Sequence, residues 1–214
     1  VGADGPTHAG SFDTTYLTTL PNFIVMAASD EAELVRMINT STEINDRPCA
    51  FRYPRGTGLG SILPSINEKI EIGKSKIIKE GKKLAILNFG ARLNETLKAA
   101  ENLLKKGVPI TVVDARFAKP LDENLIWQLA TTHEAIMTIE EGSIGGFGSH
   151  VVNFLTKKGL MDSNLKFRSL TLPDIFIDQD TPDNMYKVAN LDAVSIEEKV
   201  LDLLNSNIVL KKQN

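Results

Sequence analysis

The sequence predicts an α/β fold in which a mostly parallel sheet is flanked by helices. Short apolar runs of strand length alternate along the chain with longer segments whose apolar residues recur at helical spacing. Such alternation predicts parallel strands joined by right-handed helical crossovers. Apolar residues make up 42% of the 214 residues, which is enough to bury a core. We therefore expect a soluble globular protein.

The first part of the chain predicts a strand, a helix and a second strand. Residues 22–27 form an apolar run between Pro21 and Ser29, typical of a strand buried on both faces. Asp30 and Glu33 then resemble a capping box that starts a helix. The next apolar run, residues 49–53, stops at Pro54, which has no N–H to pair and ends the strand.

The middle of the chain changes in composition. From Gly56 to Lys83 it is rich in Gly, Ser, Pro, Asn and Lys, with weak alternation near residues 70–72 and 76–78. This pattern indicates a linker followed by a small hairpin or an edge strand.

The second part continues the alternation to the end of the chain. Gly107 ends its first helix, and a Thr181-Pro182 cap opens a later one. The pattern predicts strands at 84–87, 108–113, 135–139 and 166–172, and helices at 93–104, 122–130, 146–158, from 182 and at 194–204.

Composition excludes several classes of protein. A net charge of -3 and a pI near 5.7 give no basic surface for nucleic acid. The single cysteine, Cys49, cannot form an internal disulfide, so we expect a buried thiol and a reducing, cytoplasmic environment. No apolar window reaches the roughly 18 residues of a membrane span.

His8 is the candidate catalytic residue. It follows Asp4 in a loop of Gly, Pro and Thr, and an imidazole with a pKa of roughly 6.5 can move protons near neutral pH. Asp4 is close enough in sequence to orient or charge it. The alternative is a turn histidine beside an Asx-type turn made by Asp4.

Arg55 is the candidate anion-binding residue. It follows Pro54 at the carboxyl end of a predicted parallel strand, where open α/β folds place their ligands. Its guanidinium suits a phosphate or a carboxylate. The alternative is a structural salt bridge.

A glycine-rich segment at residues 142–148 links a predicted strand to a helix. It lacks the Lys-Ser/Thr of a Walker motif and the spacing of the dinucleotide fingerprint, so tight helix packing or a subunit contact is favoured. Glu140 and Glu141 could be paired acid/base carboxylates, but facing the positive end of the next helix is the favoured interpretation. His133 and His150 have no partner at metal-ligand spacing and are expected to be structural.

Several of these motifs, taken in order, resemble 1-deoxy-D-xylulose-5-phosphate synthase, a thiamine-diphosphate enzyme of the transketolase-like group. The resemblance runs along essentially the whole chain. It is carried by residues 4–8 (DGPTH), 16–17, 21–22, 29–34 (SDEAEL), 52–56 (RYPRG), 114–122 (DARFAKPLD), 172–174 and 191–192.

The resemblance implies the domain organisation of a larger enzyme. Residues 1–62 would be the C-terminal half of a pyrimidine-binding domain, 63–80 a linker or hairpin, and 81–214 a transketolase C-terminal domain. The expected fold is therefore a partial pyrimidine-binding-type domain followed by a transketolase C-terminal-like domain.

The resemblance also implies a reaction and its residues. The family joins pyruvate to D-glyceraldehyde 3-phosphate and releases carbon dioxide, which feeds isoprenoid and thiamine synthesis. By resemblance His8 is the active-site histidine, Asp4 contacts substrate and Arg55 holds the phosphate of the aldehyde. A proton donor at the developing alkoxide and an anchor for a dianion are what such an addition requires.

Thiamine diphosphate and Mg²⁺ are the cofactors that the resemblance implies for a homodimeric, full-length parent. The family residues that hold them would lie upstream of Val1, so we expect no cofactor-binding or metal-binding residue here and no activity of residues 1–214 alone. Two alternatives remain: a transketolase or the β subunit of a 2-oxoacid dehydrogenase, and a non-catalytic module for dimerisation or regulation.

Overall fold

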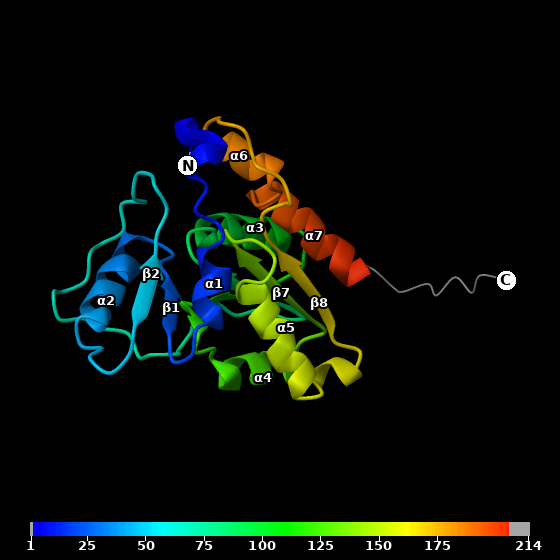
Figure 1. Ribbon diagram of the computed structural model, residues 1–214. Helices are drawn as coiled ribbons and strands as arrows, with labels where there is room; N and C mark the ends of the chain where they lie inside the picture. Colours follow the sequence, from blue (N-terminus) through cyan, green and yellow to red (C-terminus); the bar gives the residue numbers. More distant parts are fainter. Residues whose placement is uncertain (1, 206–214) are drawn as a thin grey trace.

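The computed structural model describes residues 2–205, and it confirms the predicted α/β fold (Figure 1). The helices and strands form around two separate sheets. In chain order they are η1 (Gly2–His8), α1 (Asp13–Thr19), β1 (Ile24–Ala27), α2 (Glu31–Ser41), β2 (Cys49–Arg52), β3 (Lys76–Lys79), β4 (Leu84–Phe89), α3 (Leu93–Lys105), β5 (Thr111–Asp114), β6 (Phe117–Lys119), α4 (Glu123–Thr132), β7 (Ala135–Glu140), α5 (Phe147–Lys157), η2 (Leu160–Asp162), β8 (Lys166–Leu170), α6 (Pro182–Val188) and α7 (Ala193–Asn205).

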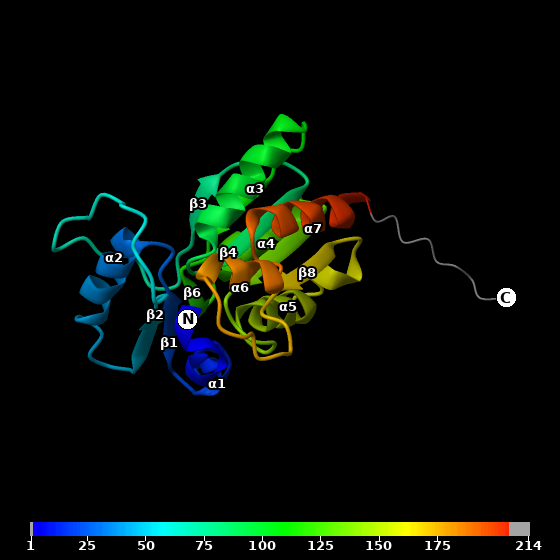
Figure 2. The same cartoon turned by 90° about the horizontal axis from the view of Figure 1, so that it is seen from above.

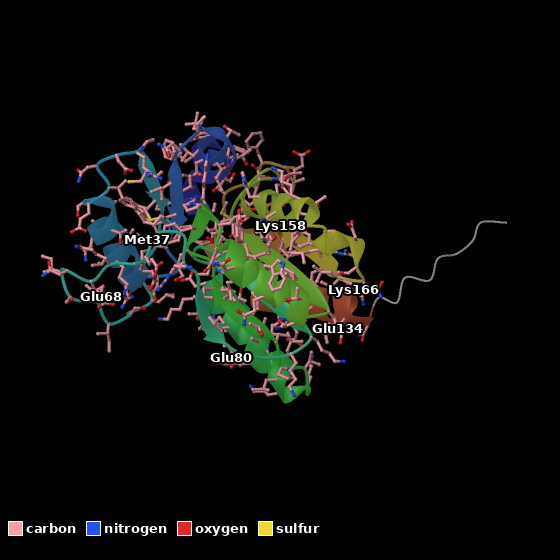
Figure 3. All side chains as sticks on the ribbon, turned by 90° about the horizontal axis from the view of Figure 1, so that it is seen from below. Met37, Glu68, Glu80, Glu134, Lys158 and Lys166 are labelled. Atoms are coloured by element: carbon pink, nitrogen blue, oxygen red, sulfur yellow. The ribbon has the colours of Figure 1, made fainter. Side chains whose placement is uncertain are left out.

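The first sheet has the order β2-β1-β6. β1 pairs in parallel with β2, as the strand-helix-strand pattern predicts. The helix between them begins at Asp30, whose side chain accepts a hydrogen bond of 2.8 Å from the backbone N–H of Glu33. Met37 of α2 is fully buried against this sheet, among the side chains of the first part of the chain (Figure 3). The predicted cap starts α2, and the burial of Met37 holds the helix against the sheet.

The second sheet has the order β3-β5-β4-β7-β8, and only the β3 pairing is antiparallel. β4, β5 and β7 are buried at every position, as strands covered on both faces should be. One core cluster joins these strands to α3 and α7, and another joins them to α4 and α5 (Figure 2). Residues 76–79 form an edge strand, so the edge-strand alternative holds and the hairpin does not.

Four elements differ clearly from the sequence prediction. The structure has η1 and α1 at its start, where no helix was predicted. Phe117 is buried in the core and opens β6, an unpredicted strand that pairs antiparallel with β1. The first sheet is therefore completed by a strand from the second part of the chain. β5 starts at Thr111 rather than Val108, because Pro109 has no N–H to pair.

Candidate active site

The segment that carries Asp4 and His8 lies directly on the second part of the chain. Gly5 has φ 54°, and a Cβ there would lie 2.9 Å from the Cβ of Gln179. Only glycine allows this approach without a shift. η1 and α6 accordingly lie side by side (Figure 1).

Asp4 and Arg55 form an ion pair between Oδ2 and Nη1. Arg55 follows β2, which ends at Arg52 and runs parallel to β1, so it lies at the carboxyl end of the strands, as predicted. Its side chain is 66% exposed, which leaves the guanidinium open to a ligand. Without a ligand, Arg55 therefore forms the structural salt bridge of the alternative interpretation, with Asp4 as its partner.

His8 ends η1 and is exposed. Its Nδ1 lies 3.0 Å from Oγ1 of Thr7, and that hydroxyl donates to the backbone oxygen of Asp4 at 2.8 Å. The expectation that the Asp4 carboxylate orients His8 is wrong for this structure, because the carboxylate pairs with Arg55 instead. Thr7 connects the two residues, in a side-chain turn like the one the turn-histidine alternative describes.

A cavity of about 540 Å³ opens beside the Asp4–Arg55 pair. Its walls come from the start of the chain, the end of β2, the loop after β7 and the segment before α6, so both parts of the chain contribute. Arg55 lines it, whereas His8 does not. The lining residues are Gly5, residues 9–12, residues 52–55, Glu141, Ser143, Ile144, residues 172–177, Pro182, Met185 and Tyr186.

Arg52 connects the segments around this cavity. Its guanidinium donates to the Asp13 carboxylate at 2.9 Å, to the Glu141 carbonyl at 3.1 Å and to the Gly10 carbonyl at 3.4 Å. Sequence reasoning missed this role. The available signal was a cation at the end of the otherwise apolar run 49–53.

A second arginine, Arg92, contacts two of the residues that line the cavity. Nε of Arg92 donates to Oε1 of Glu141 at 2.7 Å, and its guanidinium carbon lies 3.3 Å from the ring centre of Tyr186. Burial and the negative charge of Glu141 raise the pKa of Tyr186 well above its usual value, so its hydroxyl stays protonated. No local pattern in the sequence predicted this cluster.

The paired-carboxylate hypothesis for Glu140 and Glu141 is wrong, because the two side chains serve different partners. Glu140 is fully buried and accepts backbone N–H bonds of 2.9 Å each from Phe147 and Gly148. Burial raises its pKa. The amides at the start of α5 are thus occupied by the chain's own carboxylate, which confirms helix capping for Glu140 and rules out a phosphate loop there.

The two other histidines have structural surroundings, as predicted. Nε2 of His133 lies 2.9 Å from Oγ1 of Thr111, and burial lowers its pKa. Burial, together with the charge of Lys119, lowers the pKa of His150. Cys49 is half-buried, and burial raises the pKa of its thiol.

The described part of the chain offers no metal centre. Within residues 2–205 no three His, Cys, Asp or Glu side chains are placed to hold an ion. None of the helices described between these residues has the length and apolar character needed to cross a membrane.

Two family models match the chain in sequence order. The pyrimidine-binding domain of transketolase matches residues 1–58, and the transketolase C-terminal domain matches residues 73–196. The chain belongs to the transketolase family. The border between the two matches falls in the linker region, and the predicted domain bounds at 62 and 81 stay predictions.

A solved transketolase structure has the same fold. It is described as a split-gene transketolase in an inactive β4 tetramer. The two chains share 27% sequence identity with a TM-score of 0.81, over 95% of this chain and 65% of the other. This chain therefore spans less than two thirds of that transketolase chain.

Proposed function

We propose that this chain supplies the substrate-facing part of a thiamine-diphosphate-dependent 1-deoxy-D-xylulose-5-phosphate synthase. The observation that carries the proposal is the Asp4–Arg55 pair beside a cavity that Arg55 lines, in a chain with two transketolase-family domains. His8 does not line the cavity but is connected to Asp4 through the Thr7 hydroxyl. The Thr7-His8 and Tyr53-Pro54-Arg55-Gly56 contexts favour the synthase over a transketolase or a 2-oxoacid dehydrogenase β subunit.

The reaction joins pyruvate and D-glyceraldehyde 3-phosphate and releases carbon dioxide. Thiamine diphosphate would supply the nucleophilic carbon for this addition. Arg55 leaves Asp4 and binds the phosphate of the aldehyde through charge-assisted hydrogen bonds. Asp4 is then free to accept a hydrogen bond from a substrate hydroxyl. His8 donates a proton to the aldehyde oxygen as the carbon–carbon bond forms.

The residues described here do not fit the diphosphate and its Mg²⁺, since no carboxylate cluster among residues 2–205 could hold the metal. We assign that role to another segment or subunit, which forms the assembled enzyme with this chain. Residues 1–214 alone are then expected to be inactive and to bind thiamine diphosphate weakly. Calorimetric titration with cofactor and Mg²⁺ tests this, and micromolar binding would refute it.

We propose that the assembled enzyme is a homodimer in which each copy of this chain works with the segment or subunit that holds the cofactor. The description of the structural neighbour as an inactive tetramer supports self-association of such a part. Sedimentation of the purified chain at high concentration measures it, and a monomer there would count against the proposal.

The deciding assay supplies the assembled enzyme with pyruvate and D-glyceraldehyde 3-phosphate and measures carbon dioxide and the five-carbon product. Arg55→Ala should raise the KM for the phosphorylated aldehyde, and His8→Gln should lower kcat. Transfer from a ketose phosphate without any reaction of pyruvate would favour the transketolase alternative. Absence of both reactions would favour the non-catalytic module.

A further inference from the structure

We propose that Glu31 is the positioning residue for Arg55: its carboxylate clasps the loop that follows β2 and so fixes where the Arg55 guanidinium meets a phosphate. This inference rests on the proposed function. It concerns residues 54–61, which leave β2 and curl around the α2 side of the molecule (Figure 1, Figure 2).

The loop has little else to hold it. Residues 53–60 are exposed, and side chains of the loop and its continuation project into solvent, with Ile62 93% exposed and Leu59 59% exposed. Between residues 53 and 61, the described chain gives no backbone N–H bond other than those to Glu31. Packing therefore does not determine the conformation of the loop.

The Glu31 carboxylate binds three consecutive backbone amides of that loop. Leu59 donates to Oε2 at 3.0 Å, and Gly60 and Ser61 donate to Oε1 at 2.5 and 2.8 Å. The neighbouring Asp30 accepts a further bond of 3.0 Å from the Ser61 hydroxyl. Charge-assisted bonds of this kind are about twice as strong as neutral ones.

Two glycines make the clasp possible. A Cβ on Gly58 would lie 2.8 Å from Oε1 of Glu31, so a larger residue there would displace the carboxylate from the loop amides. Gly60 has φ 83°, in the left-handed region that glycine adopts without strain. The Glu31 carboxylate accepts hydrogen bonds from the Glu31 backbone N–H and from the loop amides. These bonds lower the pKa of Glu31, so its carboxylate is charged and binds the loop at neutral pH.

The clasp and the ion pair hold the loop at its two ends. Arg55 is tied to Asp4, and three residues later the chain reaches Glu31. When a phosphate replaces Asp4 as the partner of Arg55, the first of these ties is released, and beyond Arg55 the loop is then held by the bonds to Glu31 and Asp30. Loss of the clasp should then weaken phosphate binding, because a misplacement of about 1 Å can cost on the order of 100-fold.

The test compares Glu31→Gln in the assembled enzyme with Glu80→Gln as the matched control. Glu80 is exposed at the edge of the second part and makes no described side-chain contact (Figure 3). Glu31→Gln should raise the KM for D-glyceraldehyde 3-phosphate at least about tenfold with kcat nearly unchanged. It should leave reaction with unphosphorylated D-glyceraldehyde unaffected, and it should add nothing in an Arg55→Ala background.

Binding of glycerol 3-phosphate measures the same effect without turnover, and so separates this inference from the proposed function. Weaker binding by Glu31→Gln than by Glu80→Gln, together with faster hydrogen exchange at amides 59–61, supports the inference even if no aldehyde reacts. Equal binding by the two variants, including no binding by either, overturns it. Equal losses with the phosphorylated and unphosphorylated aldehydes also overturn it, since they indicate a general structural effect.

Discussion

Asp114 makes the stability of the protein depend on pH near neutrality. It ends β5 and is 1% exposed. Its Oδ2 accepts a hydrogen bond of 2.6 Å from the Ser29 hydroxyl, and its Oδ1 accepts one of 3.2 Å from the backbone N–H of Arg116. Burial raises the pKa of Asp114 to about 7, the Ser29 bond opposes this, and the charge of Glu33 adds to it. The perturbation we consider is Asp114→Asn.

The sign of the effect follows from proton binding. Between pH 4 and pH 7 the folded carboxyl of Asp114 keeps its proton, whereas in the unfolded chain, with a pKa of about 3.9, it has lost it. Because the folded state binds more protons, the free energy of unfolding falls as pH rises through this window and levels off above pH 7. From pH 5 to the folded pKa is about 2 units, and each is worth about 1.4 kcal/mol, which gives about 3 kcal/mol.

Asparagine at position 114 stays neutral and keeps both hydrogen bonds, with its amide donating to Ser29. Urea unfolding at pH 5 and pH 8 should therefore show the stability of Asp114→Asn, relative to wild type, rising by about 3 kcal/mol between the two pH values. The control is Asp202→Asn, because Asp202 is exposed on α7. The reasoning is refuted if the difference between Asp114→Asn and wild type is the same at both pH values.

Three further substitutions, with Gly10→Ala as a control for the first, test the packing around the second sheet. Gly148→Ala should cost about 1–3 kcal/mol, because its Cβ would lie 2.1 Å from Oγ of Ser169. Gly10→Ala, which meets nothing within 4 Å, should change the urea midpoint little, and equal losses would contradict the packing argument. Glu140→Gln should cost about 1–3 kcal/mol, since one amide at the start of α5 loses its acceptor. Hydrogen exchange at the amides of Phe147 and Gly148 should accelerate, and unchanged exchange would contradict the capping role of Glu140. Phe89→Ala should cost about 3–5 kcal/mol by thermal unfolding, because the ring is fully buried and stacked at 5.1 Å on another phenylalanine; a loss below about 1 kcal/mol would show that the core closes around the cavity.

The strands that sequence predicted best are those with continuous apolar runs. Residues 84–87 and 135–139 became β4 and β7, which are buried at every position. Such runs are read correctly because both faces of the strand meet apolar neighbours, so every residue contributes to the pattern. The Asp30 cap was equally readable, since a helix start depends on residues only three positions apart.

The sequence did not predict α1, because its residues, DTTYLTT, are rich in threonine and show no apolar helical periodicity. Threonine hydroxyls can bond backbone oxygens three or four residues earlier, which weakens helix preference in isolation. Here Oγ1 of Thr18 donates to the oxygen of Thr14 at 2.6 Å, and Lys119 donates to the oxygen of Thr18 at 3.1 Å. The second contact comes from about 100 residues away and cannot be read from local sequence.

The candidate site was predictable in its members but not in their pairing. Local sequence identified Asp4, His8 and Arg55, and the structure brings Asp4 and Arg55 into contact. Local sequence could not show that the Asp4 carboxylate would pair with the Arg55 guanidinium rather than with the His8 imidazole. Nor could it show that Arg92 would lie 2.7 Å from Glu141, because that contact depends on how α3 packs on the second sheet.

The turn from Asp114 to Phe117 joins the two parts of the molecule. The backbone oxygen of Arg116 accepts a 3.0 Å bond from Ala27, and its guanidinium donates to Glu33 at 2.9 Å. Arg116 has φ 58°, a conformation that costs a non-glycine residue on the order of 1 kcal/mol and persists only where contacts hold it. These two contacts come from the first part, so the folded first part stabilises the turn.

We therefore expect the two parts to unfold in one transition. Each part has a single natural reporter: Cys49 is half-buried in β2, and Trp127 lies in α4. Thiol labelling of Cys49 and fluorescence of Trp127 should change at the same urea concentration. Arg116→Ala removes the guanidinium bond while Phe117 and the β6 pairing remain, and it should separate the two transitions, with Cys49 exposed first. Labelling of Cys49 in the wild-type protein while Trp127 fluorescence is still native would show that the turn does not couple the two parts.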